Sequence, residues 1–226
     1  MNLNSKIETL ENIYKIYDDF AGTLDIACKR YCSLCCTVNV TMTTLEGRKI
    51  AKSIIPEEKK NLFDKIRCSS SMQRFRPRET INMLAELSME EGFVPEENNA
   101  FPGQCPLLIN HECAIYNERP FGCRCFVSKQ NCSESGIATV DDFVLTVNNI
   151  FLQVLEHVDA GGFYGNLADV LLFLENTENR DNLLSSKMIN PLSTLIKNHH
   201  LKILMIPPEH REKAQPILAA LYKLKY

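Results

Sequence analysis

Cysteine is the residue of this chain with the most reactive side chains, and its distribution is uneven. Four cysteines fall within nine residues and four more within a later segment of twenty-one, so two short segments hold eight of the ten cysteines. The first segment carries Cys28, Cys32, Cys35 and Cys36, and the second carries Cys105, Cys113, Cys123 and Cys125. Thiolates this close together repel one another unless a soft metal ion or an iron–sulfur cluster lies between them. The eight cysteines are therefore candidate metal ligands.

The first segment contains a Cys-x-x-Cys turn, from Cys32 to Cys35. Such a turn lets two sulfur atoms approach one metal ion at about 2.3 Å each. The neighbouring pair Cys35-Cys36 adds a constraint, because adjacent side chains diverge and seldom bind the same tetrahedral ion. We therefore expect either a centre with several metal ions or two centres close together. Lys29 and Arg30 lie inside the segment, where their charges offset part of the negative charge of a thiolate site.

Three other interpretations of the first segment stay open. A free cysteine packs well as a small hydrophobic residue. Disulfides are typical of exported proteins, but residues 1–11 lack the apolar core of a signal peptide. A thioredoxin-type redox pair also has a Cys-x-x-Cys turn, but it follows a strand and begins a helix, whereas here a helical pattern precedes a loop. Metal binding is the hypothesis that we carry forward.

The second segment has wider spacings between its cysteines, of eight, ten and two residues. These spacings suit a loop that wraps around a site and contacts it several times. Arg119 and Arg124 lie in the same segment and can donate hydrogen bonds to sulfur or to nearby carbonyl groups. His111 lies between two cysteines, where it is either a further ligand or, as we prefer, a histidine of a surface loop.

The two segments together resemble the YkgJ-type cysteine-cluster family, whose members are described as zinc- or iron-chelating domains. The family has a Cys-x-x-Cys-x-x-Cys-Cys run, followed by a Cys-Pro-Leu and a Cys-x-Ile-Tyr-x-x-Arg-Pro-x-x-Cys-Arg pattern. The matching residues of this chain are Cys32, Cys35 and Cys36, then Cys105, Pro106 and Leu107, then Cys113, Ile115, Tyr116, Arg119, Pro120, Cys123 and Arg124. Cys28 lies four positions before Cys32, where the family motif has three, and Cys125 lies outside the motif. The resemblance covers residues 28–126.

This resemblance implies a metalloprotein that carries zinc or iron, the iron as an ion or as a 4Fe-4S cluster. Some relatives are described as iron–sulfur oxidoreductases, and a related protein is linked to flagellin lysine N-methylation. The first hypothesis is a cytoplasmic protein whose two cysteine segments converge on zinc, iron or both. The alternatives are an enzyme that modifies protein side chains and a module in which zinc shapes a loop for an unidentified protein partner.

Helical periodicity predicts the elements that position these segments. Thr43 and Thr44 mark the start of one helix, Pro56 opens another, and Pro216 predicts a kink or a restart in the last one. The expected helices span about 5–21, 44–53, 56–66, 78–91, 139–160, 167–174 and 209–224. We expect a loop at 69–71, and a short strand or a buried turn at 201–206. Residues 93–135 are interrupted by proline and glycine, which predicts irregular structure around the second cysteine segment.

Composition limits the class of protein. The chain has 226 residues and a hydrophobic fraction of 45%, so a core can form without metal. Its net charge is −3, so we expect no basic face for nucleic acid. No apolar run approaches the ~18 residues that span a membrane, and we expect a cytoplasmic protein. The predicted fold class is mainly α, with an irregular cysteine-rich metal-binding core surrounded by helices. We expect a cysteine-cluster domain over 1–135 and a helical part over 136–226, packed together as one unit.

Overall fold

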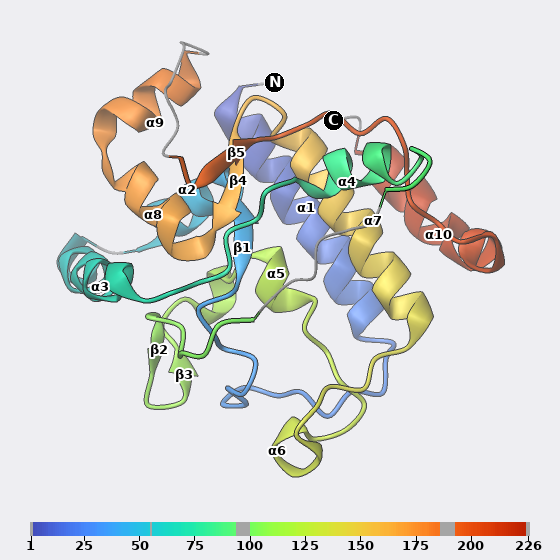
Figure 1. The fold of residues 1–226 in the computed structure, drawn as a ribbon, viewed down its shortest axis with the longest axis horizontal. Helices are drawn as coiled ribbons and strands as arrows, with labels where there is room; N and C mark the ends of the chain where they lie inside the picture. The colour runs from blue at the N-terminus through green and yellow to red at the C-terminus, as the bar shows by residue number, and fades with distance from the viewer. Residues whose placement is uncertain (1, 55, 94–99, 186–192, 225–226) are drawn as a thin grey trace.

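Two long helices, α1 (Leu3–Ala21) and α7 (Asp142–Val158), lie side by side through the middle of the molecule (Figure 1). The computed structural model of the chain describes residues 2–54, 56–93, 100–185 and 193–224. The C-terminal helix α10 (Arg211–Tyr222) packs on α1 and continues through Pro216, so the proline does not end it. The apolar faces of these helices, which the sequence pattern predicts, form one core, with the rings of Tyr17 and Phe121 4.7 Å apart.

A second core lies between two pairs of helices and a small sheet. The helices are α2 (Thr44–Ser53), α3 (Pro56–Cys68), α8 (Leu167–Glu175) and α9 (Thr177–Leu184). The sheet is antiparallel, with strand order β1 (Thr41–Thr43), β4 (Phe163–Asn166) and β5 (Leu195–Lys197). Gly165 pairs with Met42 on one side and with Leu195 on the other. Because β1 pairs with β4 and α1 packs on α7, residues 1–135 and 136–226 share both the sheet and the helical core.

The mainly α class is confirmed, but several local predictions were wrong. Helix α4 spans only Ile81–Leu87, because Thr80 is extended and caps it, while Asn82 N donates to Glu156 Oε2. Residues 69–71 form a short 3₁₀ helix (η1, Ser69–Ser71) rather than a plain loop. Residues 201–206 are not a strand, because side chains of α7 accept from their backbone instead of a neighbouring strand. Helix α9 and strands β1, β4 and β5 were not predicted.

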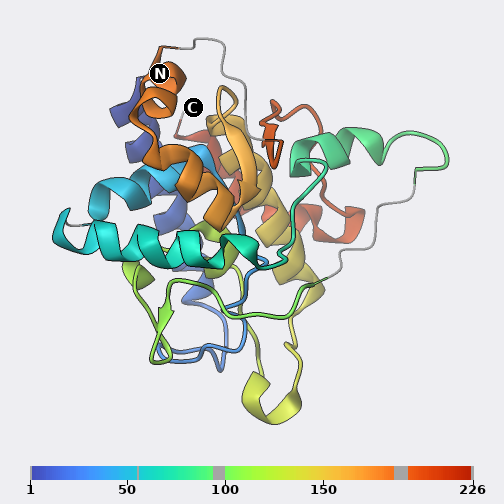
Figure 2. The ribbon, with the colours of Figure 1, turned by 60° about the vertical axis from the view of Figure 1, so that its left-hand side comes forward.

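The cysteine segments lie at one end of the molecule, below the C-terminal end of α1 in Figure 1 and close together again in Figure 2. The second segment is irregular, as predicted, and residues 94–99 of the predicted irregular stretch lie outside the described residues. Its short elements are β2 (Leu108–Ile109), β3 (Glu112–Cys113), η2 (Tyr116–Glu118) and α5 (Phe121–Arg124). Helix α6 (Cys132–Ser135) follows the segment, and the 3₁₀ helix η3 (Pro208–His210) precedes α10. Within the described ranges, no helix is long and apolar enough to cross a membrane.

Candidate metal centre

The two cysteine segments lie side by side, as expected from their composition. The backbone N–H of Cys105 donates to the carbonyl oxygen of Cys36 across 2.9 Å, and Thr37 forms an antiparallel bridge with Gln104. These contacts fix the start of the second segment against the end of the first. They join residues about seventy positions apart in the chain.

Five of the eight clustered cysteines line one small cavity of about 70 Å³. They are Cys35, Cys36, Cys105, Cys113 and Cys123. Both segments contribute, two cysteines from the first and three from the second. The rest of the lining is mostly apolar and belongs largely to the second core, with Val40, Leu107, Ile115 and Leu167 among its members. The cavity is therefore lined chiefly by sulfur and hydrocarbon, with the Arg119 side chain as its charged member.

A tight hairpin places Cys113 at the cavity. Strand β3 pairs with β2 so that Cys113 lies opposite Leu108. The turn between the strands is Asn110-His111, and both residues have positive φ, of 50° and 64°. A two-residue hairpin turn with positive φ at both positions matches the right-handed twist of the strands, and asparagine tolerates this conformation well. His111 is one of the two turn residues, and it is exposed. Its Nδ1 lies 3.1 Å from Ser33 Oγ, and it does not line the cavity.

A buried carboxylate, that of Glu46, holds the helix that carries Cys123. Its Oε1 accepts from the backbone N–H of Phe121 and from Tyr14 Oη, both at 2.7 Å. Its Oε2 accepts from Thr43 N at 2.8 Å and from Thr43 Oγ1 at 2.9 Å. One side chain of α2 thus connects α1, its own N-terminus and the first residue of α5. The residue two positions after Phe121 is Cys123, so Glu46 fixes one side of the cavity.

The sequence contains part of this signal. Thr43-x-x-Glu46 has the form of a capping box, and both reciprocal hydrogen bonds of the box are present. By its position in the sequence, Glu46 is the acidic residue of the first turn of α2. Its partners Tyr14 and Phe121 are distant in the sequence, so no local pattern predicts these contacts.

Burial shifts the thiols of the cavity toward the neutral form. It raises the pKa of Cys105 to about 11, and it raises the pKa of Cys113 and of Cys123 as well. Cys35 donates a hydrogen bond to Cys36, which raises the pKa of Cys35 and lowers that of Cys36. Without a cation the cavity therefore favours thiols over thiolates, and Cys36 is the sulfur whose ionisation its neighbour assists.

Arg119 is the cation that faces these sulfurs. Its guanidinium lies 4.1 Å from the ring centroid of Tyr116, and it lowers the pKa of Cys35 and Cys113 as a secondary effect. Its Nε is buried and has no hydrogen-bond partner among the described residues. A buried donor without an acceptor is costly, and a thiolate in the cavity would supply an acceptor of opposite charge. Arg124, in contrast, donates to the carbonyl oxygens of Arg119 and Asn117, one of the two roles expected for it.

The other three clustered cysteines do not line the cavity. Burial raises the pKa of Cys28, and Cys32, Cys132 and Cys35 raise it further to a smaller extent. Cys125 packs against the first core, with Sγ 3.7 Å from the Gly122 carbonyl oxygen, and burial raises its pKa to about 12. Ligand roles for Cys28, Cys32 and Cys125 stay predictions.

No group of three or more His, Cys, Asp or Glu side chains in the described part of the chain is placed to hold a metal ion. The cysteines surround the cavity, but their sulfur atoms do not form a ready coordination shell. The residues nevertheless fit a soft metal by the chemistry of their donors and by the unpartnered Nε of Arg119. The cysteine-rich metal core expected from the sequence is therefore still a prediction.

No family model matches the chain. A search of curated proteins and a search of solved structures also gave no match. The resemblance to the YkgJ-type family therefore stays a prediction that depends on the cysteine motif alone.

Proposed function

We propose that this protein binds zinc or iron, as an ion or as an iron–sulfur cluster, through cysteine thiolates of its two cysteine segments. The donors are drawn from Cys35, Cys36, Cys105, Cys113 and Cys123. What carries the proposal is that these five side chains, from two distant segments, line one cavity of about 70 Å³. Five cysteines at one cavity, four of them partly buried and Cys35 exposed, are more than packing requires, since any small apolar residue fills such a space.

The chemistry of the cavity favours a soft cation over the alternatives. All ten cysteines are free in the structure, although adjacent thiols are present. A soft cation would stabilise the thiolate forms that burial disfavours, and Arg119 would offset the remaining negative charge and satisfy its own Nε. A tetrahedral ion needs four ligands, so the fifth cysteine would either stay unbound or serve a centre with more than one metal.

A second centre would use Cys28 and Cys32, the cysteines of the first segment that do not line the cavity. Zinc in either place would be structural, because it has no redox chemistry, whereas iron would add electron transfer. An enzyme that modifies protein side chains, of the lysine N-methylase or iron–sulfur oxidoreductase type, is the second function that we consider. A zinc-shaped module for binding a partner is the third.

The test is elemental analysis for zinc, iron and sulfide after anaerobic purification, with an absorption spectrum between the near ultraviolet and the visible. Cys113→Ser and Cys35→Ser should each lower the amount of metal per chain. Cys68→Ser is the matched control, because Cys68 is an exposed cysteine at the end of α3 and does not line the cavity. Cys28→Ser should lower the metal content only if a second centre exists.

Two results would overturn the proposal. One is a native preparation without zinc or iron that also fails to take up either metal when it is added. The other is a full metal load in both Cys113→Ser and Cys35→Ser. The loss of helical circular dichroism on chelation would assign the metal to a structural role, and a brown protein with an absorption band near 400 nm would assign it to iron and sulfide.

A further inference from the structure

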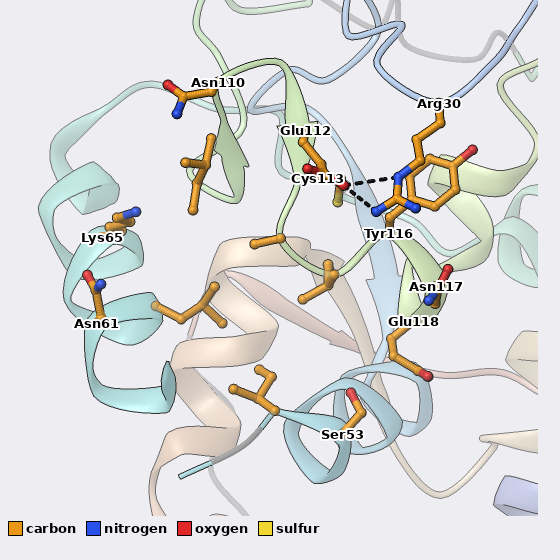
Figure 3. A pocket seen from close by; sticks show the side chains of 15 residues that line it. Arg30, Ser53, Asn61, Lys65, Asn110, Glu112, Cys113, Tyr116, Asn117 and Glu118 are labelled. Atoms are coloured by element: carbon orange, nitrogen blue, oxygen red, sulfur yellow. Dashed lines mark hydrogen bonds and ion pairs between the residues drawn. The ribbon is translucent and has the colours of Figure 1, made fainter. Parts of the chain in front are cut away.

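A groove of about 660 Å³ lies beside the cysteine cavity, between α3 and the hairpin β2–β3 (Figure 3). Asn61 and Lys65 of α3 line one side, and Arg30 and Glu112 lie on the opposite side. The groove is nearly ten times larger than the cavity and falls within the size range of organic ligand sites.

The groove and the cavity share a wall. Cys113, Ile115 and Tyr116 line both spaces. On the groove side, the guanidinium of Arg30 lies 5.5 Å from the ring centroid of Tyr116, and on the cavity side that of Arg119 lies 4.1 Å from it. A molecule bound in the groove would therefore contact the segment that carries one candidate ligand of the centre.

The groove lining carries two cations, Arg30 and Lys65, and two anions, Glu112 and Glu118. Arg30 is paired with Glu112, its Nε donating to Oε1 at 3.0 Å, so these two charges cancel. Glu118 is likewise paired with Lys49. Lys65 has no ion-pair partner among the described residues, which leaves one ammonium group in the groove to attract an anion.

The other groups of the lining are those that recognise a peptide. Asn61, Asn110 and Asn117 present side-chain amides, which both donate and accept hydrogen bonds as a peptide group does. Ile109 is large and apolar and is 39% exposed at the rim. Tyr31 is also exposed, at 61%, and the guanidinium of Arg30 lies 5.6 Å from the centroid of its ring. A small ligand in the groove would leave Ile109 and Tyr31 in water, whereas a chain segment would be long enough to cover them.

We propose that the groove binds an extended segment of a partner polypeptide that carries an acidic side chain, with the carboxylate at Lys65 and the neighbouring apolar side chain against Ile109. The inference rests on the proposed function only in placing that segment beside the cysteine centre. It names the class of partner, an acidic protein segment, that would reach the centre from outside.

The test uses a degenerate library of short peptides passed over the immobilised full-length protein, with the bound pool sequenced by mass spectrometry. The wild type should enrich Asp and Glu over Lys and Arg by roughly twofold to fivefold, the effect of one exposed ion pair. Lys65→Glu should abolish or reverse this enrichment. Lys60→Glu is the matched control, because Lys60 is an exposed lysine of the same helix that does not line the groove, and it should change little. Ile109→Ser should lower the total amount of bound peptide.

The proposal is overturned if acidic residues are not enriched, or if Lys65→Glu and Lys60→Glu change the pool equally. It is also overturned if light scattering finds a wild-type dimer that Ile109→Asp converts to a monomer, because a second copy would then occupy the groove. Measuring zinc and iron uptake on the same wild-type preparation separates this proposal from the previous one. Peptide selection that survives in a protein unable to bind metal would leave the groove assigned and the metal centre refuted.

Discussion

Replacing Glu46 with glutamine tests whether one buried carboxylate positions the cysteine cavity. The side chain is 3% exposed and accepts four hydrogen bonds, two at each oxygen. Two of the donors are backbone N–H groups, of Thr43 and Phe121, which cannot turn away. The other two are the hydroxyl groups of Tyr14 and Thr43, which can rotate and accept instead of donating.

The magnitude follows from these donors. Glutamine has a single oxygen, so its amide nitrogen must face either the N–H of Thr43 or that of Phe121. One buried backbone donor then loses its acceptor, and the remaining hydrogen bonds lose the contribution of a charged acceptor. Together these losses are worth roughly 3 to 5 kcal/mol of the free energy of unfolding. For a chain of this length the melting temperature should fall by roughly 6 to 20 °C.

The assay is thermal and urea unfolding of Glu46→Gln beside two reference variants. Tyr14→Phe removes one donor and leaves the carboxylate, and should cost roughly 1 to 2 kcal/mol. Glu112→Gln removes a partly exposed carboxylate with one ion pair and should cost less than about 1 kcal/mol. Because Phe121 precedes Cys123 on α5, alkylation of Cys123, followed by mass spectrometry, should also become faster in Glu46→Gln.

The reasoning fails if Glu46→Gln is no less stable than Glu112→Gln. If stability falls but Cys123 is alkylated at the wild-type rate, Glu46 supports the core without positioning the cavity.

Two further predictions concern the pH dependence of stability and the packing under the cavity. Burial raises the pKa of Asp159 from 3.8 to about 6, so between these values the folded protein holds a proton that the unfolded chain has lost, and the free energy of unfolding should fall as pH rises. Asp159→Asn should remove this part of the pH dependence, which amounts to on the order of 3 kcal/mol between about pH 4 and pH 6. Urea titrations of the wild type and the variant measure it. A difference in the free energy of unfolding that is the same at every pH would refute the prediction. Gly122→Ala should cost roughly 1 to 3 kcal/mol, because its Cβ would lie 2.7 Å from the Thr41 carbonyl oxygen, whereas Gly161→Ala, with no atom within 4 Å of its Cβ, should be neutral within about 0.5 kcal/mol. Equal urea midpoints for these two glycine variants would contradict the close packing of α5 on β1.

Local patterns predicted the elements whose stabilising contacts are local. The starts and ends of α1, α2, α7 and α8 lie within a few residues of the predicted positions. In a helix each N–H donates to a carbonyl group four residues earlier. The residues that decide its periodicity and its caps are therefore close together in the sequence. The Thr43 cap of α2 is an example, since the capping residue and its partner Glu46 are three positions apart.

The short strands β1, β4 and β5 were missed for the opposite reason. Each has three or four residues, too few for an alternating pattern, and each is held by a strand more than twenty residues away. The boundary of α4 was wrong because Glu156, from α7, accepts from the backbone of Asn82 and favours an extended start. In both cases the partner that decides the conformation lies far along the chain.

The sequence by itself determined that this is a mainly helical protein with two concentrated groups of thiols, because residue type and helical periodicity are local properties. The tertiary structure decided which thiols meet. It placed Cys35, Cys36, Cys105, Cys113 and Cys123 around one cavity and left Cys125 against the first core, although Cys125 is only two residues from Cys123. A cavity is formed by the packing of distant segments, here held by Glu46 and the Asn110-His111 turn, and spacing along the chain does not specify which side chains face it.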